Sequence, residues 1–224
     1  MKQLEEKHKL ATRWCHWINF PILSFMILSG LLIYWSNDEY RIGAGSVTLF
    51  HFFPDWFYNA THIDHKLAYG MALHFCLAWI FTLNGIAYFI YTIASGEWRE
   101  LAPTAKSFTE AIQVVKHDMG LKVPLPPQGR YNAAQRITYS AIIVMGGCSV
   151  LTGLAIFKPG QLSWLTAMLG GYEWARWEHF WLTMGYCGFF CIHIAQVIRA
   201  GWSNFRSMVC GYDIVEVMEK SHAE

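Results

Sequence analysis

The chain has 224 residues, of which 54% are hydrophobic, 17% are aromatic and only 15% are charged. Soluble domains carry about 25% charged residues, so this composition excludes an ordinary soluble fold and confines charge to the connections between apolar segments. The formal net charge is +1 and the sequence contains no long basic run, which excludes a nucleic-acid-binding role.

Four stretches without Asp, Glu, Lys or Arg are each long enough to cross a membrane as a helix. A hydrocarbon core requires about 20 apolar residues in helical conformation, because every backbone polar group must bond within the segment. We therefore expect an all-α membrane protein with a single domain over 1–224, in which four transmembrane helices form a bundle. The expected spans are 14–36, 67–93, 137–157 and 179–198.

Lys and Arg are distributed unevenly between the two sides of these spans. Thirteen lie in the N-terminal segment, the second connection and the C-terminal tail, whereas four lie in the first and third connections. Because cytoplasmic segments of membrane proteins are richer in Lys and Arg, both termini are expected in the cytoplasm. The first apolar stretch is too long for a cleavable signal, so we expect it to insert as the first span.

The polar connections carry further patterns. Residues 106–120 have apolar side chains at helical spacing and are expected to form an amphipathic helix at the inner interface. The connections 37–64 and 158–176 are rich in Trp, Tyr and Phe, which fits an interfacial aromatic belt, a docking surface for an extracytoplasmic partner, or both. We detect no internal repeat, and the absence of Cys-x-x-Cys-His argues against covalent haem attachment.

The last expected span contains two histidines, His179 and His193, with no charged residue between them. Their separation of 14 residues is nearly four helical turns, which places both imidazoles on one side of the helix, roughly 21 Å apart along its axis. A histidine within lipid is costly unless it is paired or coordinated, and imidazole is a common axial ligand of haem iron. The pair therefore indicates one ligand for each of two haems, near opposite faces of the membrane.

Two other histidines match these ligands in expected depth. His16 lies at the cytoplasmic start of the first span, at the level of His193, and His65 lies at the outer start of the second span, at the level of His179. We therefore expect His16 and His193 to ligate a cytoplasmic-side haem iron, and His65 and His179 to ligate an outer-side haem iron. The competing interpretation is that all four histidines only hydrogen-bond to their neighbours.

The second span contains an alternative ligand. His74 lies nine residues after His65, which rotates it about 180° on a helix, so both cannot face one porphyrin. We rank His65 first, His74 second and His62 third. On the first span, Gly30 lies 14 residues after His16, where a missing side chain would leave room for the outer haem.

Several segments together resemble a known family over nearly the whole chain. His179 and His193 match its fourth-span histidine pair. The other segments are Trp14-Cys15-His16-Trp17 with Leu28-Ser29-Gly30-Leu31 in the first span, His65-Lys66-Leu67-Ala68-Tyr69-Gly70 in the second, and Gly129-Arg130-Tyr131-Asn132-Ala133-Ala134-Gln135-Arg136 at the start of the third. The resemblance is to the di-haem b-type cytochrome subunits of membrane-bound formate dehydrogenase, nickel-iron hydrogenase and thiosulfate reductase.

This resemblance implies a multi-pass protein of the bacterial inner membrane with two b-type haems and a menaquinone pocket beside the cytoplasmic haem. Asn132 and Gln135 carry amides that can hydrogen-bond a carbonyl of menaquinone or ubiquinone. The alternative is that Asn132 caps the third helix while Gln135 faces interfacial water. Tyr131, Arg130 and Arg136 are weaker candidates for proton delivery or for contact with a haem propionate.

We therefore expect a lipid-embedded, quinone-reactive electron-transfer subunit. Its partner would be an extracytoplasmic redox subunit of the hydrogenase, formate dehydrogenase, or molybdenum or sulfur-compound oxidoreductase type. No catalytic residue is assigned, because two imidazoles per iron leave no open coordination position. The alternatives are a stand-alone di-haem oxidoreductase acting on superoxide or ferric compounds, and a haem-free scaffold or transporter.

Overall fold

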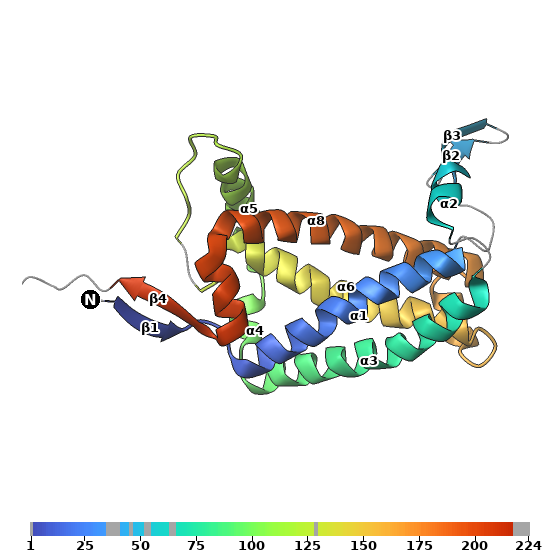
Figure 1. Cartoon of the computed structure of the whole chain (residues 1–224), viewed down its shortest axis with the longest axis horizontal. Coiled ribbons are helices and arrows are strands. Elements are labelled where there is room, and N and C mark those ends of the chain that lie inside the picture. Colours follow the sequence, from blue (N-terminus) through green and yellow to red (C-terminus); the bar gives the residue numbers. More distant parts are fainter. Residues whose placement is uncertain are drawn as a thin grey trace, which may run out of the picture. The chain divides into compact units, whose positions relative to one another are not determined.

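Four long helices dominate the computed structural model (Figure 1), which describes residues 2–34, 41–44, 47–51, 55–62, 66–127 and 130–216. Each of the four is long and apolar enough to cross a membrane, as expected for a bundle of four transmembrane helices. These helices are α1 (Leu10–Tyr34), α3 (Leu67–Ala94), α6 (Ala133–Phe157) and α8 (Tyr172–Cys210).

Shorter elements lie between and beyond the long helices. The helices are α2 (Asp55–Thr61), α4 (Trp98–Leu101), α5 (Ala105–Asp118) and α7 (Ser163–Met168). The strands are β1 (Lys2–Glu6), β2 (Arg41–Ala44), β3 (Val47–His51) and β4 (Tyr212–Glu216). β1 pairs antiparallel with β4, and β2 pairs antiparallel with β3. The structure therefore adds two small ribbons to the all-helical architecture expected from the sequence, and α5 occupies the segment expected to be an amphipathic helix.

α8 begins seven residues before the expected span start at His179. The absence of charge delimits a span but not a helix, and here the first turn is polar: Arg176 Nη1 lies 3.2 Å from Glu173 Oε2. Gly170 and Gly171 precede this turn with φ angles of 80° and 105°, conformations that glycine adopts without strain. As a consequence, His179 lies about two turns inside the helix.

α8 is interrupted near its C-terminal end. Gly201 has φ 79° and ψ 177°, which are not helical angles, and a second helical segment continues from there to Cys210. Arg199, just before the interruption, bonds Asp118 Oδ1 of α5 at 2.9 Å. The part of α8 that carries His179 and His193 therefore ends near Gly201.

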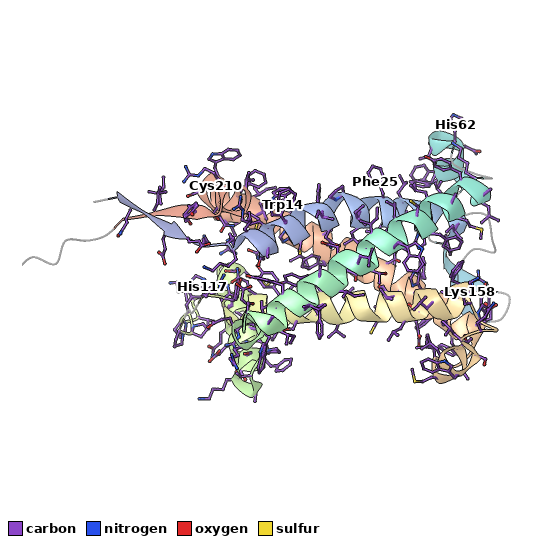
Figure 2. The ribbon with its side chains drawn as sticks, turned by 90° about the horizontal axis from the view of Figure 1, so that it is seen from below. Trp14, Phe25, His62, His117, Lys158 and Cys210 are labelled. Carbon is purple, nitrogen blue, oxygen red and sulfur yellow. The ribbon has the colours of Figure 1, made fainter. Side chains whose placement is uncertain are left out.

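The chain divides into two compact units, one made of 1–15 with 85–224 and the other of 16–84. In the first unit, α6 packs against α4, α5, α7 and α8. Figure 2 shows His117 of α5 and Lys158 toward opposite ends of α6. In the second unit, α1 and α3 approach closely at Gly70, where a Cβ would lie 2.9 Å from Leu32 Cβ.

Polar contacts tie the first residues of the chain to its last described residues. Lys7 Nζ donates to Asp213 Oδ2 at 2.8 Å and to Asn204 Oδ1 at 3.0 Å. Ser203 Oγ donates to Asp213 Oδ1 at 2.6 Å. These bonds connect the β1·β4 ribbon to the second segment of α8, and they form a terminal clamp of Lys7, Ser203, Asn204 and Asp213.

The terminal clamp makes ribbon stability depend on pH. The hydrogen bond from Lys7, followed by that from Ser203, lowers the pKa of Asp213 from 3.8 to about 2. Because the folded pKa lies below the unfolded one, this stabilisation is complete above about pH 4 and is lost as the pH falls toward 2. We expect hydrogen exchange at the β1 amides, normalised to intrinsic rates, to accelerate over that interval.

Asp213→Asn is the matched control for this titration. It should weaken the ribbon by up to about 1 kcal/mol at neutral pH, as is usual for a partly exposed ion pair. It should also remove the acceleration between pH 4 and 2. An equal acid response in wild type and variant would assign the effect to other carboxylates.

Candidate functional site

His179 of α8 is held by a hydroxyl group of α6. Its Nδ1 lies 2.8 Å from Thr152 Oγ1, and the Thr152 side chain is buried. The same Oγ1 lies 2.8 Å from the carbonyl oxygen of Cys148, to which it donates. A hydroxyl has one proton, so both contacts are hydrogen bonds only if Nδ1 of His179 carries the hydrogen and donates it to Thr152. We assign this tautomer from the network, and it leaves the imidazole lone pair on Nε2.

His74 of α3 is held in the same way by α1. Its Nδ1 lies 3.0 Å from Oγ of the fully buried Ser29. Ser29 Oγ in turn donates to the carbonyl oxygen of Met26 at 3.1 Å. The same proton accounting places a hydrogen on Nδ1 of His74 and the lone pair on Nε2.

A glycine follows each hydroxyl residue and faces the same histidine. A Cβ at Gly30 would lie 3.5 Å from Cε1 of His74, and a Cβ at Gly153 would lie 3.5 Å from Cε1 of His179. Each imidazole therefore packs against helix backbone. Gly30 was expected to leave room for an outer haem, and in the structure it lies against His74.

The correspondence between the two helix pairs extends to their sequences. Ser29 and Thr152 each lie five residues before the last residue of their helix, and His74 and His179 each lie seven residues after the first. The matching segments are Leu28-Ser29-Gly30-Leu31 with Leu151-Thr152-Gly153-Leu154, and His74-Phe75-Cys76-Leu77 with His179-Phe180-Trp181-Leu182. We refer to this short correspondence as the internal repeat, which the sequence analysis did not detect. Comparing the first expected span with the third, and the second with the fourth, would have found it.

His193 and His16 are the two residues expected to ligate the cytoplasmic-side haem. His193 is eight residues before the interruption at Gly201, and His16 is six residues after the first residue of α1. His193 stacks on Phe189 with ring centroids 5.4 Å apart, and His16 meets Trp17 edge to face at 5.3 Å. On α8, the buried Tyr186 lies midway between His179 and His193 in the sequence.

The remaining second-span candidates have different positions. His65 lies outside the described residues, and its number places it before Leu67, the first residue of α3. His62 follows α2, is exposed and has a φ of 50°. His74 is half-buried within α3.

Asn132 and Gln135 form a capping box at the start of α6. Gln135 N donates to Asn132 Oδ1 at 2.9 Å, and Asn132 N donates to Gln135 Oε1 at 3.0 Å. Asn132 is therefore the N-cap of the helix, as the alternative interpretation held. In both bonds a backbone N–H donates to a side-chain oxygen, so neither bond uses the side-chain amide nitrogens of Asn132 and Gln135.

The residues around this cap have structural contacts of their own. Arg130 Nη2 lies 3.5 Å from Glu97 Oε1, and Arg136 Nη2 donates to the carbonyl oxygen of Ala102 at 2.7 Å. Tyr131 meets Tyr139 edge to face with centroids 5.5 Å apart. Burial raises the pKa of Tyr131, so its phenol is neutral at physiological pH.

Comparison with known proteins identifies the family to which the chain belongs. The profile of the family described as "Prokaryotic cytochrome b561" matches residues 7–211. The chain belongs to this family. It is therefore a multi-pass membrane protein that binds b-type haem and serves electron transfer. A similar protein is the "Putative protein-methionine-sulfoxide reductase subunit YedZ1" of Azospira oryzae, with 27% identity over 197 residues that cover 88% of this chain and 92% of the relative.

The residues present fit a haem. An axial histidine binds iron through a ring nitrogen that carries a lone pair, while its other N–H is usually donated to a neighbouring acceptor. His74 and His179 both have this state, because each donates its Nδ1 hydrogen to a hydroxyl.

Close contact between α1 and α3 is a condition for the His74 geometry. A Cβ at Gly70 would lie 3.2 Å from Ser29 O and 3.2 Å from Ile33 N, both of which are backbone atoms. We expect Gly70→Ala to push the helices apart, to destabilise the protein by about 1–3 kcal/mol and to lower the thermal unfolding midpoint in detergent.

Gly85→Ala is the matched control on the same helix. Among the described atoms, a Cβ at Gly85 meets nothing within 4 Å. The control should therefore unfold at the wild-type temperature or slightly above it, because Ala favours helix over Gly. Equal midpoints for the two variants would show that the close approach at Gly70 has no energetic role.

Proposed function

We propose that the protein is the membrane-embedded electron-transfer subunit of an oxidoreductase complex and carries two b-type haems. The observation that supports this most strongly is the contact of Nδ1 with a buried hydroxyl in both His74 and His179, from which we assign each the tautomer with its lone pair on Nε2. When bound, a haem with two imidazole ligands supplies one-electron transfer without an open coordination position. Both termini are proposed to lie in the cytoplasm, and the membrane is proposed to be the bacterial inner membrane.

For the outer-side haem we propose His74 and His179, with His74 in place of His65. The reason is the distance of each histidine from the start of its helix. His179 lies seven residues inside α8, and His74 lies seven residues inside α3, whereas His65 precedes the first residue of that helix. The identical hydroxyl and glycine contacts of His74 and His179 support the same assignment.

For the cytoplasmic-side haem we propose His16 and His193. The 14 residues between His179 and His193 separate the two levels by about 21 Å along the helix. Between the two histidines, Tyr186 of α8 is buried. The protein's contribution is to keep the two sites at fixed depths on rigid helices.

The quinone site is proposed to lie beside the start of α6. Asn132 and Gln135 would present their amide nitrogens to a quinone carbonyl, while their oxygens keep the capping box intact. The neutral Tyr131 beside them would supply a proton on quinone reduction. The quinone would be menaquinone or ubiquinone.

The partner is proposed to be an extracytoplasmic catalytic subunit, because this chain is itself an electron-transfer protein and its relative is named as a subunit of a reductase. The candidate partner types are hydrogenase, formate dehydrogenase, and molybdenum or sulfur-compound oxidoreductases. Copurification of the native complex tests this proposal. The stand-alone alternative would be favoured if the chain is isolated without a partner and its reduced haems are oxidised by superoxide or by ferric compounds.

Haem content distinguishes the ligand assignments. Wild-type protein should hold two haems per chain, as measured by reduced-minus-oxidised spectra with haem extraction. His74→Ala and His179→Ala should each lose the same haem, and His16→Ala and His193→Ala should each lose the other. His65→Ala should keep both. Loss of a haem in His65→Ala with retention in His74→Ala would restore the original assignment, and a colourless wild type would refute the proposed function.

Two substitutions at one position separate capping from quinone contact. Asn132→Asp keeps an oxygen for the capping box but removes the amide N–H, whereas Asn132→Leu removes both. If the amide binds quinone, both variants should slow quinone-linked electron transfer about tenfold, because a lost hydrogen bond costs about 1–1.5 kcal/mol. Both should retain two haems. A wild-type rate in Asn132→Asp would leave Asn132 with a capping role alone.

A further inference from the structure

Resting on the proposed function, we infer that Ser29 and Thr152 are a matched pair of positioning residues that lower the redox potential of the outer-side haem. They act through the histidines and not by contact with the haem. The geometry points to this because each hydroxyl accepts the Nδ1 hydrogen of one proposed ligand, at 3.0 Å for His74 and 2.8 Å for His179.

The two hydroxyls have little freedom to do anything else. Ser29 is 0% exposed and Thr152 is 2% exposed, so neither exchanges its partner for water. Each has committed its single proton to a carbonyl oxygen of its own helix, Met26 O for Ser29 and Cys148 O for Thr152. Each hydroxyl oxygen can therefore only accept a hydrogen bond from the imidazole that it contacts. Ring orientation and tautomer are thereby fixed together.

The two hydrogen bonds are expected to shift the redox potential of the haem in one direction. An acceptor on Nδ1–H increases electron density on the imidazole and strengthens its donation to iron. Stronger donation stabilises the ferric state more than the ferrous state and therefore lowers the potential. A hydroxyl that already donates to a carbonyl is a better acceptor, because hydrogen bonds in a chain polarise one another.

The internal repeat makes Ser29 and Thr152 equivalent. They occupy the same position in α1 and α6, and their histidines occupy the same position in α3 and α8. Both should therefore act on one haem and in the same direction. The positions that correspond to His16 and His193 in the other repeat are Tyr139 and Tyr88, so the repeat does not extend to the ligands of the cytoplasmic haem.

Potentiometric titration of the purified, haem-loaded protein tests this inference. We expect Ser29→Ala and Thr152→Val to raise the midpoint potential of the same haem and to leave that of the other haem unchanged. Dissociation of the affected haem should also be faster, by about 10- to 100-fold as for other supporting contacts of metal ligands. Thr152→Ser keeps the hydroxyl and should restore the wild-type potential.

Two control variants remove hydroxyls whose bonds, within the described residues, go to the backbone four residues earlier. They are Ser24→Ala on α1, where Oγ donates to Phe20 O, and Thr138→Val on α6, where Oγ1 donates to Ala134 O. Neither should change the two potentials. If Ser29→Ala or Thr152→Val loses a haem, retention in Ser29→Thr and Thr152→Ser would assign the loss to the hydroxyl, and loss there too would overturn the inference.

Further outcomes of the titration would overturn the inference about Ser29 and Thr152. Unchanged or lowered potentials in both Ser29→Ala and Thr152→Val would overturn the inference, as would shifts on two different haems. These results leave the proposed function standing, provided that wild type holds two haems. A wild type without haem would instead refute the proposed function itself.

Discussion

The structure depends on the cost of placing an imidazole inside a membrane. An unsatisfied polar group in hydrocarbon costs several kcal/mol, and each of two histidines meets this cost on one side by donating Nδ1–H to a buried hydroxyl. That donation decides the tautomer, and the tautomer decides which nitrogen carries a lone pair. In the function proposed for this chain, iron binding by His74 and His179 therefore depends on Ser29 and Thr152, which need not touch the iron.

The sequence was sufficient for the features that follow from local chemistry. Uninterrupted apolar stretches predicted the four spans, and the 14-residue spacing of His179 and His193 predicted two levels on one helix. The capping role of Asn132 was foreseen as an alternative, because Asn followed by Gln three residues later is typical of a helix start. Family membership was also visible, since the motifs that carry it lie in continuous segments.

The sequence was misleading where helix and span differ in length. The uncharged stretch of the fourth span begins at His179. The helix α8 begins earlier, at Tyr172, because the polar residues before the apolar stretch are also helical. This difference in depth is the reason that we now propose His74 in place of His65, and the choice between them stays a prediction. The β1·β4 ribbon could not have been predicted, since its register depends on pairing between the two ends of the chain. The repeat was missed because its two matching segments are only four residues long.

The interruption at Gly201 has a mechanical consequence. A continuous helix transmits bending and rotation along its whole length, whereas a residue at φ 79° and ψ 177° breaks the hydrogen-bonded ladder and acts as a swivel. We therefore expect displacement of the β1·β4 ribbon to be absorbed at Gly201. The part of α8 that carries His179 and His193 precedes Gly201, so the spacing between these two histidines is expected to stay constant when the C-terminal segment moves.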